Sequence, residues 1–327
     1  MSYGTGATTA NPDVRIRPYA GPPDHTGLQA VRSAVRDGDG WFPGPDDPDC
    51  SPDQRATCLV AEVTDGSGKQ IVGYTWLDWW TEVDSTRVYL LLGWVAPAWL
   101  RRGIGGALLT RQEEQASALA RRQPGSGPIM LGTNAAEDDP ETAALLHRHG
   151  YRLAFTVVTM TCDPAAATRL TPPPTLPTSI DLRTVAETDH PRIHQAIEEC
   201  FTPSRTGYVP RSFAEYQRDV RERQHDTDLW RVAWAGDEVA GVVISEIRPD
   251  GTGHTPWVAV REPWRRRGLG RALVYGSLCG LADRRVPSAE LSTVAENPHR
   301  SVRFYEGLGY QVIEREPRYR KPLPLSS

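Results

Sequence analysis

Two related stretches of the sequence decide the fold, Arg101-Arg-Gly-Ile-Gly-Gly-Ala-Leu-Leu109 and Arg266-Arg-Gly-Leu-Gly-Arg-Ala-Leu-Val274. In each, an apolar run of strand type leads into a glycine-rich turn, and a helical pattern follows the turn. Three further pairs of segments match in the same order and at nearly the same spacing: Val14-Arg-Ile-Arg17 with Ile180-Asp-Leu-Arg183, Ile71-Val-Gly-Tyr-Thr75 with Val239-Ala-Gly-Val-Val243, and His149-Gly-Tyr151 with Leu308-Gly-Tyr310. Such repetition indicates one domain that has been duplicated.

The length of the chain and one proline-rich segment predict where the two domains lie. A chain of 327 residues is long enough for two domains, each with a core of its own. The segment Thr171-Pro-Pro-Pro-Thr-Leu-Pro-Thr178 favours an extended connector, because proline disrupts both strands and helix interiors. We therefore expect a flexible start at residues 1–12, a first domain at 13–165, a proline-rich linker at 166–178 and a second domain at 179–327.

Each copy is expected to fold as mixed α/β (α+β), with a largely antiparallel sheet flanked by helices. An opening strand and a helical stretch precede three strands joined by tight turns, and the glycine-rich turn then opens a long helix. A further strand, a short helix and a final strand complete each copy. The three strands before the glycine turn are expected at residues 57–64, 70–80 and 87–95, and at 230–234, 239–247 and 256–260. This order excludes a TIM barrel and a plain doubly wound sheet.

Composition excludes several classes of protein. The net charge of −4 argues against a nucleic-acid partner, because binding to nucleic acid depends on clustered positive charge. No apolar run reaches the roughly 18 residues of a membrane span, and residues 1–12 carry no secretory pattern, so we expect a cytoplasmic protein without a membrane partner. The five cysteines are widely spaced and form no C-x-x-C pair, so we expect neither a zinc ribbon, nor a disulfide scaffold, nor another metal site.

The glycine turns carry the chemical signal. Glycines let backbone N–H groups approach a ligand closely, and the start of a helix favours negative charge, so a pyrophosphate fits there and the neighbouring arginines could add to its binding. A purely structural turn with solvated arginines is the alternative. A Walker loop would need a lysine that neither turn has, and a dinucleotide fingerprint would need a third glycine where Leu108 and Leu273 stand.

The second copy resembles the GNAT-type N-acetyltransferases. The resemblance rests on Val260-Arg-Glu-Pro-Trp-Arg-Arg-Arg-Gly-Leu-Gly-Arg-Ala-Leu-Val274, Leu291-Ser-Thr-Val-Ala-Glu-Asn-Pro298 and Arg303-Phe-Tyr-Glu-Gly-Leu-Gly-Tyr310. The first copy matches less fully, with Leu100 for the leading Arg or Gln, Asp138 for the motif's Asn and Leu146 for its Tyr. The two-unit arrangement is distantly similar to mycothiol synthase and related actinobacterial tandem acetyltransferases, so the resemblance implies two tandem GNAT domains, the first with a degenerate motif and the second catalytic.

The resemblance implies acetyl-CoA as co-substrate and the primary amine of a small molecule as acceptor. In the second copy it places the co-substrate on Val258, Ala259, Val260, Arg265, Arg266, Arg267, Gly268, Leu269, Gly270, Arg271 and Asn297. In the first copy it places the equivalent site on Trp94, Val95, Arg101, Arg102, Gly103, Ile104, Gly105 and Gly106. Whether the first copy binds acetyl-CoA or only packs against the second is left open at this point. Asn297 could equally begin a turn, because Asn-Pro is a common turn starter.

Acetyl transfer also needs an acid and a base. The leaving thiolate has a reference pKa of about 8.5, so a nearby phenol can protonate it, and Tyr305 is the candidate by resemblance. A tyrosine at this position could instead serve only to pack the core. The amine must lose a proton before it attacks, and Glu246 is a conceivable base, with His254 of similar standing. The alternative for both is a solvated strand side chain, since every second residue of a strand faces outward.

The acceptor is expected to contact the loop-rich stretches at residues 38–52 and 202–226. Trp41, Phe42, Tyr208 and Tyr216 could line its pocket, or could simply anchor these loops. Two other functions stay open: an acetyltransferase with a protein or peptide as acceptor, and a non-catalytic acyl-CoA-binding sensor or scaffold. The chain is expected to be a monomer or a homodimer.

Overall fold

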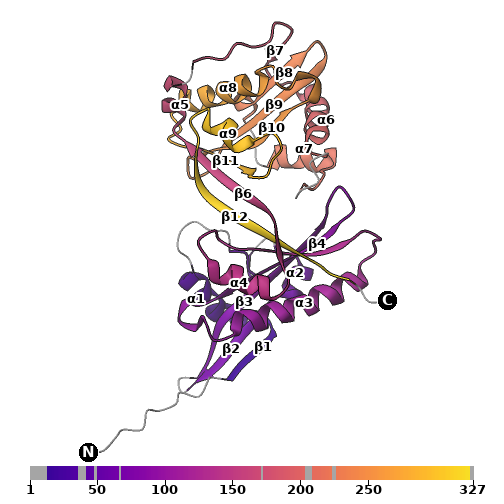
Figure 1. The fold of residues 1–327 in the computed structure, drawn as a ribbon, viewed down its shortest axis with the longest axis vertical. Coiled ribbons are helices and arrows are strands. Elements are labelled where there is room, and N and C mark those ends of the chain that lie inside the picture. Colours follow the sequence, from indigo (N-terminus) through magenta and orange to yellow (C-terminus); the bar gives the residue numbers. More distant parts are fainter. Residues whose placement is uncertain are drawn as a thin grey trace, which may run out of the picture.

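A computed structural model of the chain describes residues 13–35, 42–47, 50–65, 68–170, 172–202, 208–222 and 226–324. Its strands form one continuous mixed sheet of twelve strands in the order β1-β2-β3-β4-β5-β12-β6-β11-β10-β9-β8-β7. Figure 1 shows the first copy at one end of an elongated molecule and the second copy at the other, joined by the long strands β6 and β12. The predicted mixed, largely antiparallel architecture flanked by helices is therefore confirmed, with a single sheet running through both copies.

The two copies contain the same succession of elements. The first copy contains β1 (Asp13–Pro18), α1 (His25–Val35), α2 (Pro52–Thr57), β2 (Leu59–Asp65), β3 (Gly68–Thr81), β4 (Arg87–Val95), α3 (Ile104–Arg122), β5 (Ile129–Asn134), α4 (Pro140–Arg148) and β6 (Arg152–Cys162). After α5 (Pro164–Leu170), the second contains β7 (Asp181–Arg183), α6 (His190–Phe201), α7 (Phe213–Glu222), β8 (Arg231–Ala235), β9 (Glu238–Ile247), β10 (Gly253–Val260), α8 (Leu269–Asp283), β11 (Ala289–Val294), α9 (Ser301–Glu306) and β12 (Gln311–Pro322). No described helix is long and apolar enough to cross a membrane.

The last strand of each copy completes the sheet of the other copy. β6 pairs antiparallel with β11 of the second copy, from Cys162 opposite Ala289 to Val157 opposite Val294. β12 pairs antiparallel with β5 of the first copy, from Asn134 opposite Arg318 to Met130 opposite Pro322. The two strands also pair with each other, and they lie side by side at the centre of Figure 1. The duplicated halves are thus joined through an exchange of strands.

The connector between the copies is partly helical. Residues 164–170, the first of which precede the linker expected at 166–178, form α5, which lies against α8 with the Tyr275 hydroxyl 3.4 Å from the carbonyl oxygen of Thr168. Residues 172–177 adopt neither helix nor strand, as four prolines in Thr171–Thr178 lead one to expect.

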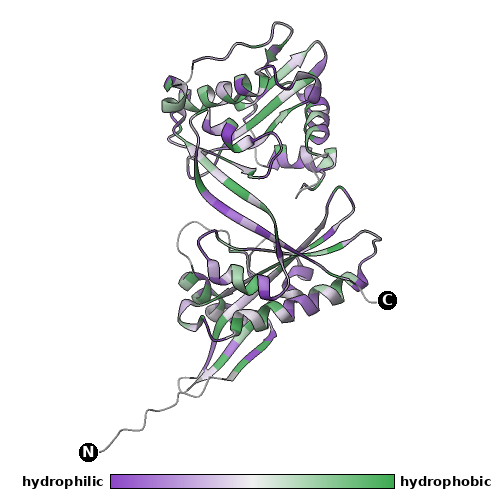
Figure 2. Cartoon of the chain, viewed as in Figure 1, coloured by the Kyte–Doolittle hydropathy of each residue, from purple (hydrophilic) through white to green (hydrophobic). Residues whose placement is uncertain are grey.

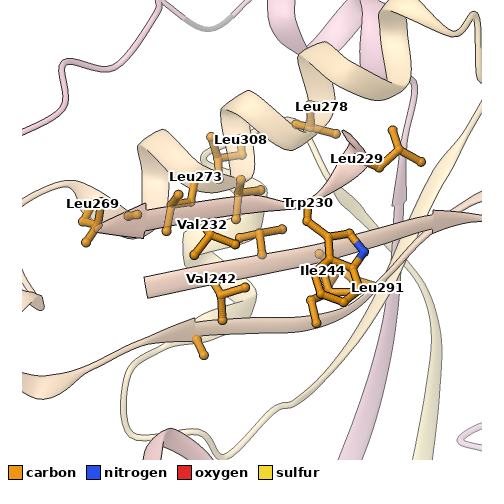
Figure 3. Close-up of a cluster of buried hydrophobic side chains, with 14 of the residues drawn as sticks. Leu229, Trp230, Val232, Val242, Ile244, Leu269, Leu273, Leu278, Leu291 and Leu308 are labelled. Atoms are coloured by element: carbon orange, nitrogen blue, oxygen red, sulfur yellow. The ribbon is translucent and has the colours of Figure 1, made fainter. Parts of the chain in front are cut away.

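The core of the second copy lies between its sheet and α8. Figure 3 shows Leu269, Leu273 and Leu278 of α8 pointing toward the strands that carry Val232, Val242 and Ile244. The exchanged strand contributes to this core, because Val158, Met160 and Cys162 of β6 belong to the same buried cluster. In return, Tyr319 of β12 is buried in a cluster of the first copy. Figure 2 shows the corresponding apolar stretches along the strands of both halves.

Candidate active site

Both glycine turns have the same unusual backbone. Arg266 and Gly268 have φ values of +62° and +82°, and Arg101 and Gly103 have +63° and +80°. A left-handed arginine costs about 1–2 kcal/mol, so its presence in both copies marks a conformation that the fold requires. Alternating right- and left-handed residues direct successive backbone N–H groups to one side and form a nest for an anion.

The start of α8 leaves backbone N–H groups available beside this turn. The amide of Ala272 donates to the carbonyl oxygen of Gly268 at 3.1 Å and begins the ladder of the helix. The amides of residues 269–271 precede that bond and have no acceptor within the helix. A Cβ atom built on Gly268 would meet no atom within 4 Å, so this glycine faces open space. The turn can therefore receive a diphosphate.

Strand β10 separates from its neighbour just before this turn. It pairs with β11 only at Gly253 and His254, and its register with β9 shifts between His254 and Trp257. The amide of Arg261 donates to Ala240 of β9, so by the alternation of an antiparallel ladder the amides of Val258 and Val260 face away from β9. They face the gap that opens between β10 and β11, where an extended ligand could pair with them.

The arginines that lead into α8 are less uniform than the sequence suggests. Arg265 donates from Nε to the carbonyl oxygen of Val260 at 2.7 Å, so it fixes the turn to the strand end. The side chains of Arg266 and Arg267 are exposed, whereas Leu269 is buried and can offer a ligand only its backbone. Gly270 has Val260 and Phe304 as its nearest neighbours, at ordinary contact distance from a built Cβ.

The first copy keeps the glycine turn but differs around it. β4 (Arg87–Val95) pairs with β3 in unbroken register, so it lacks the irregularity of β10. The ring of Trp94 stacks on Tyr74 with centroids 4.8 Å apart and lies 5.9 Å from Phe42, so this side chain packs within the first copy. Arg101 forms an ion pair with Glu141.

Tyr305 occupies the position in the second copy that Leu146 occupies in the first. The amide of Tyr310 donates to the carbonyl oxygen of Tyr305 at 3.2 Å, and the amide of Tyr151 donates to that of Leu146 at 3.0 Å. Tyr305 is 8% exposed, its ring lies 5.0 Å from that of Phe304, and burial raises the pKa of its phenol. The side chain therefore packs in the core and is also held protonated at neutral pH.

Asn297 begins a turn, which was the alternative to a role in binding the co-substrate. Its Oδ1 accepts from the amide of His299 at 2.8 Å, and its carbonyl oxygen accepts from the amide of Arg300 at 2.9 Å. Arg300 has a φ of +53° and directly precedes α9. The visible role of Asn297 is thus to shape the entry into the helix that carries Tyr305.

Glu246 and His254 form a pair on neighbouring strands. They lie opposite each other in β9 and β10, and His254 Nδ1 is 2.9 Å from Glu246 Oε1. Burial lowers the pKa of His254 below its ordinary value, although Glu246 acts in the opposite direction. At neutral pH the imidazole is therefore uncharged. With Nδ1 donating to the carboxylate, Nε2 carries the lone pair and can accept a proton.

The pair lines a pocket of about 190 Å³ between helices α6 and α7 and strands β9 and β10. The lining residues are His194, Ile197, Glu198, Tyr208, Arg211, Tyr216, Asp219, Val220, Trp230, Ile244, Glu246, His254, Pro256 and Trp257. The structure thus brings Tyr208 and Tyr216 into one pocket with Glu246 and His254, as the acceptor hypothesis requires. Phe42 lies in the first copy instead, and Trp41 is outside the described residues.

Sequence reasoning missed part of this lining. His194 and Glu198 lie four residues apart on α6, so helical spacing alone could have placed them on one face. Asp219 and Trp257 carry no comparable signal, because the packing of α7 and the irregularity in β10 bring them into the pocket. Within the described ranges, no group of three or more His, Cys, Asp and Glu side chains is arranged to hold a metal ion.

Comparison with known proteins identifies the same two units. The model of the Acetyltransferase (GNAT) family matches residues 30–151 and again residues 190–310. A mycothiol acetyltransferase from Geodermatophilus obscurus is 29% identical over 230 residues, which cover 66% of this chain and 68% of that protein.

Two solved structures share the fold along nearly the whole chain. A GCN5-related N-acetyltransferase from Sphaerobacter thermophilus has a TM-score of 0.70 at 24% identity, covering 94% of this chain and 95% of that one. A tandem GNAT protein from the clavulanic acid biosynthesis pathway has a TM-score of 0.60 at 16% identity, covering 96% of this chain and 100% of that one. The expected duplication is therefore confirmed.

Proposed function

The chain belongs to the GNAT acetyltransferase family and is an acetyl-CoA-dependent N-acetyltransferase, and from this premise we propose that its second copy acetylates the primary amine of a small molecule. The observation that carries the proposal is the Glu246–His254 pair, which lines a pocket at the point where β10 leaves β11. A base, an acceptor pocket and a strand edge for the donor thus occur together in this copy.

The donor would bind along β10 and the glycine turn. The amides of residues 268–271, supplemented by the charges of Arg266, Arg267 and Arg271, suit its diphosphate. The amides of Val258 and Val260 suit its extended arm, with Ala259 between them. Arg265 would fix the turn to the strand end, and Asn297 would act through the turn before α9.

The reaction would then proceed by direct attack. His254 Nε2 takes a proton from the ammonium form of the acceptor, while Glu246 holds the other ring nitrogen and stabilises the imidazolium that forms. The amine nitrogen forms a bond to the thioester carbon, and a strand amide facing the gap stabilises the negative charge on the carbonyl oxygen. The C–S bond breaks, the nitrogen loses its second proton to solvent as the amide forms, and the thiolate takes the proton of the Tyr305 hydroxyl. Solvent then restores the proton of Tyr305 and takes the proton held by His254.

The first copy would pack against the second copy and would not itself transfer the acetyl group. It has Leu146 in place of the phenol and an unbroken β3–β4 ladder in place of the irregular strand. Binding of acetyl-CoA at Trp94, Val95, Arg101, Arg102, Gly103, Ile104, Gly105 and Gly106 stays a prediction. The small volume of the pocket beside α6 and α7, about 190 Å³, favours a small acceptor over a protein or peptide.

The test is CoA release from acetyl-CoA over a panel of small amines, with Tyr305→Phe as the first variant. We expect turnover to fall about 100-fold while the KM for acetyl-CoA changes less than about twofold, because the phenol acts only when the thiolate leaves. Tyr275→Phe is the matched control, since Tyr275 lies on α8 of the same copy and its hydroxyl contacts the carbonyl oxygen of Thr168 on α5. Unchanged turnover in Tyr305→Phe would contradict its role as acid.

A further inference from the structure

Strand β10 contains a bulge in the middle of its pairing with β9. The register between the two strands shifts between His254 and Trp257. Two residues of β10, Thr255 and Pro256, occupy the space opposite Ser245 alone. An extra residue of this kind bends its strand and re-aims the groups on either side of it. The bulge therefore decides where the second half of β10 points.

A network of buried hydroxyl groups lies at this bulge. Ser245 Oγ is 3.0 Å from Thr255 Oγ1 and 2.6 Å from Ser277 Oγ on α8. The three side chains are at most 4% exposed, and Thr255 also lies beside the hydroxyl of the buried Tyr310. The network thus connects β9, the bulge in β10 and the helix that follows the glycine turn.

These hydroxyl groups lie in an otherwise apolar core. Ile244 and Leu278, the chain neighbours of Ser245 and Ser277, belong to the cluster drawn in Figure 3. Burying a hydroxyl group in such surroundings is unfavourable unless it is hydrogen-bonded. A shift of β10 relative to β9 and α8 would break the network and leave buried hydroxyl groups without partners. The network therefore opposes any change of the bulge.

The first copy is apolar and regular at the corresponding place. The matched segments of β3 and β9 align Leu77 with Ser245. Leu77 lies opposite Leu91 within the unbroken ladder of β3 and β4, and both side chains are buried. A regular ladder thus goes with apolar side chains in the first copy, and the bulge goes with hydroxyl groups in the second.

The helices after the glycine turns differ in the same sense. Counted from these turns, Gln112 has the position in α3 that Ser277 has in α8. The side-chain nitrogen of Gln112 donates to the carbonyl oxygens of Trp76 and Leu92, two residues that lie opposite each other in the ladder. In the first copy the helix therefore holds the two strands in register, whereas in the second copy its counterpart belongs to the network at the bulge.

We infer that the buried hydroxyl groups hold the bulge in β10 and that Thr255 is thereby a positioning residue for both substrates. The inference rests on the proposed function, which assigns the acceptor and the donor to the residues on either side of Thr255. On one side, His254 lines the pocket; on the other, the amides of Val258 and Val260 face away from β9. A shift of one residue would turn these groups toward the opposite side of the strand.

The test replaces Thr255 by valine in the full-length protein, which keeps the branched shape and removes the hydroxyl group. Isothermal titration with CoA should show binding about tenfold weaker, because a displaced backbone amide loses a hydrogen bond to the donor. Thr255→Ser keeps the hydroxyl group and should bind CoA within about twofold of the natural protein. Unchanged binding in Thr255→Val, or equal weakening in Thr255→Ser, would overturn the inference.

Thr75→Val in the first copy is the matched control. Thr75 is fully buried, and its hydroxyl oxygen accepts from the amide of Leu59 at 3.0 Å. This variant also loses a buried hydroxyl group, so urea unfolding should show reduced stability, while CoA binding should stay unchanged. Equal weakening of CoA binding in both valine variants would assign the effect to a general loss of stability and overturn the inference.

Ser277→Ala tests the other end of the network with a smaller change. It removes the hydrogen bond to Ser245 and should weaken CoA binding about threefold. Unchanged binding in this variant would overturn the inference even if Thr255→Val does not fold. The titration needs no acceptor, so its outcome does not depend on the choice of amine. Failure of every amine to release CoA with the natural protein would instead overturn the proposed function.

Discussion

Replacing Gly268 by alanine separates the backbone role of the glycine turn from its binding role. Gly268 has a φ of +82°, and a Cβ atom there would meet no atom within 4 Å, so the cost of the change is conformational. Holding alanine in a left-handed conformation costs about 1–2 kcal/mol, and we expect the free energy of unfolding to fall by that amount. The added methyl group also enters the space proposed for the diphosphate. Loss of one hydrogen bond to a charged group, about 1.5–3 kcal/mol, would raise the KM for acetyl-CoA about tenfold or more.

The duplication supplies a matched variant within the same chain. Gly103 has a φ of +80° and equally open surroundings, so Gly103→Ala should destabilise the protein to the same extent. Because we place the reaction in the second copy, the KM for acetyl-CoA should stay unchanged in this variant. Urea unfolding followed by circular dichroism and initial rates at varied acetyl-CoA measure the two effects. Equal increases in the KM for acetyl-CoA in both variants would refute the assignment of the reaction to the second copy. An unchanged free energy of unfolding in both variants would refute the idea that the left-handed backbone at these positions disfavours alanine.

Two further predictions concern proton transfer and the exchanged strand. The value of kcat/KM should fall as the pH drops through the pKa of His254, which burial holds below 6.5 and which Arg248, Glu246 and Glu290 also influence. Glu246→Gln removes a group that raises the pKa of His254, so the acidic limb of the pH–rate profile should move to lower pH. The maximal kcat/KM of the variant should be about tenfold lower than that of the natural protein. An acidic limb at the same pH in both proteins would contradict the pairing of Glu246 with His254. Met160→Ala in the buried part of β6 should lower the free energy of unfolding by about 2–5 kcal/mol. Thr159→Ala on the opposite face removes only a hydroxyl contact with Ser292 and should lower it by about 0.5–1.5 kcal/mol, as urea titration would show. Similar values for the two would contradict burial of the strand in the second core.

Local patterns were sufficient to predict most of the elements. The glycine turns predicted that a long helix begins directly after each turn, and α3 and α8 begin at Ile104 and Leu269, next to Gly103 and Gly268. The apolar run of residues 239–247 lies within β9, which is buried over most of its length. The strand expected at 256–260 instead begins at Gly253, because β10 continues past Pro256 through a shift in its register.

Features that depend on distant packing could not be predicted from local patterns. Period-two alternation favoured a solvated Glu246, yet its side chain is only 16% exposed, because it faces a pocket covered by α6 and α7. The strands with which β6 and β12 pair could not be predicted either. The alternation of apolar residues indicates which face of a strand is buried, but it does not indicate which strand lies next to it. The candidate site residues Gly268 and Tyr305 were predicted from a family motif that spans several positions, and not from local periodicity.

The exchange of β6 and β12 has a consequence for how the chain folds during synthesis. β5 gains its second neighbour only when β12 is made, after all the other described strands, so Met130 can pair with Pro322 only then. Until then β5 is an unprotected sheet edge, the kind of surface on which nascent chains aggregate. Contacts between residues so far apart in sequence slow folding, because a long loop must close before they form. Pairing of β12 with β5 therefore completes the sheet of the first copy, and it can form only after all the other described strands have been made.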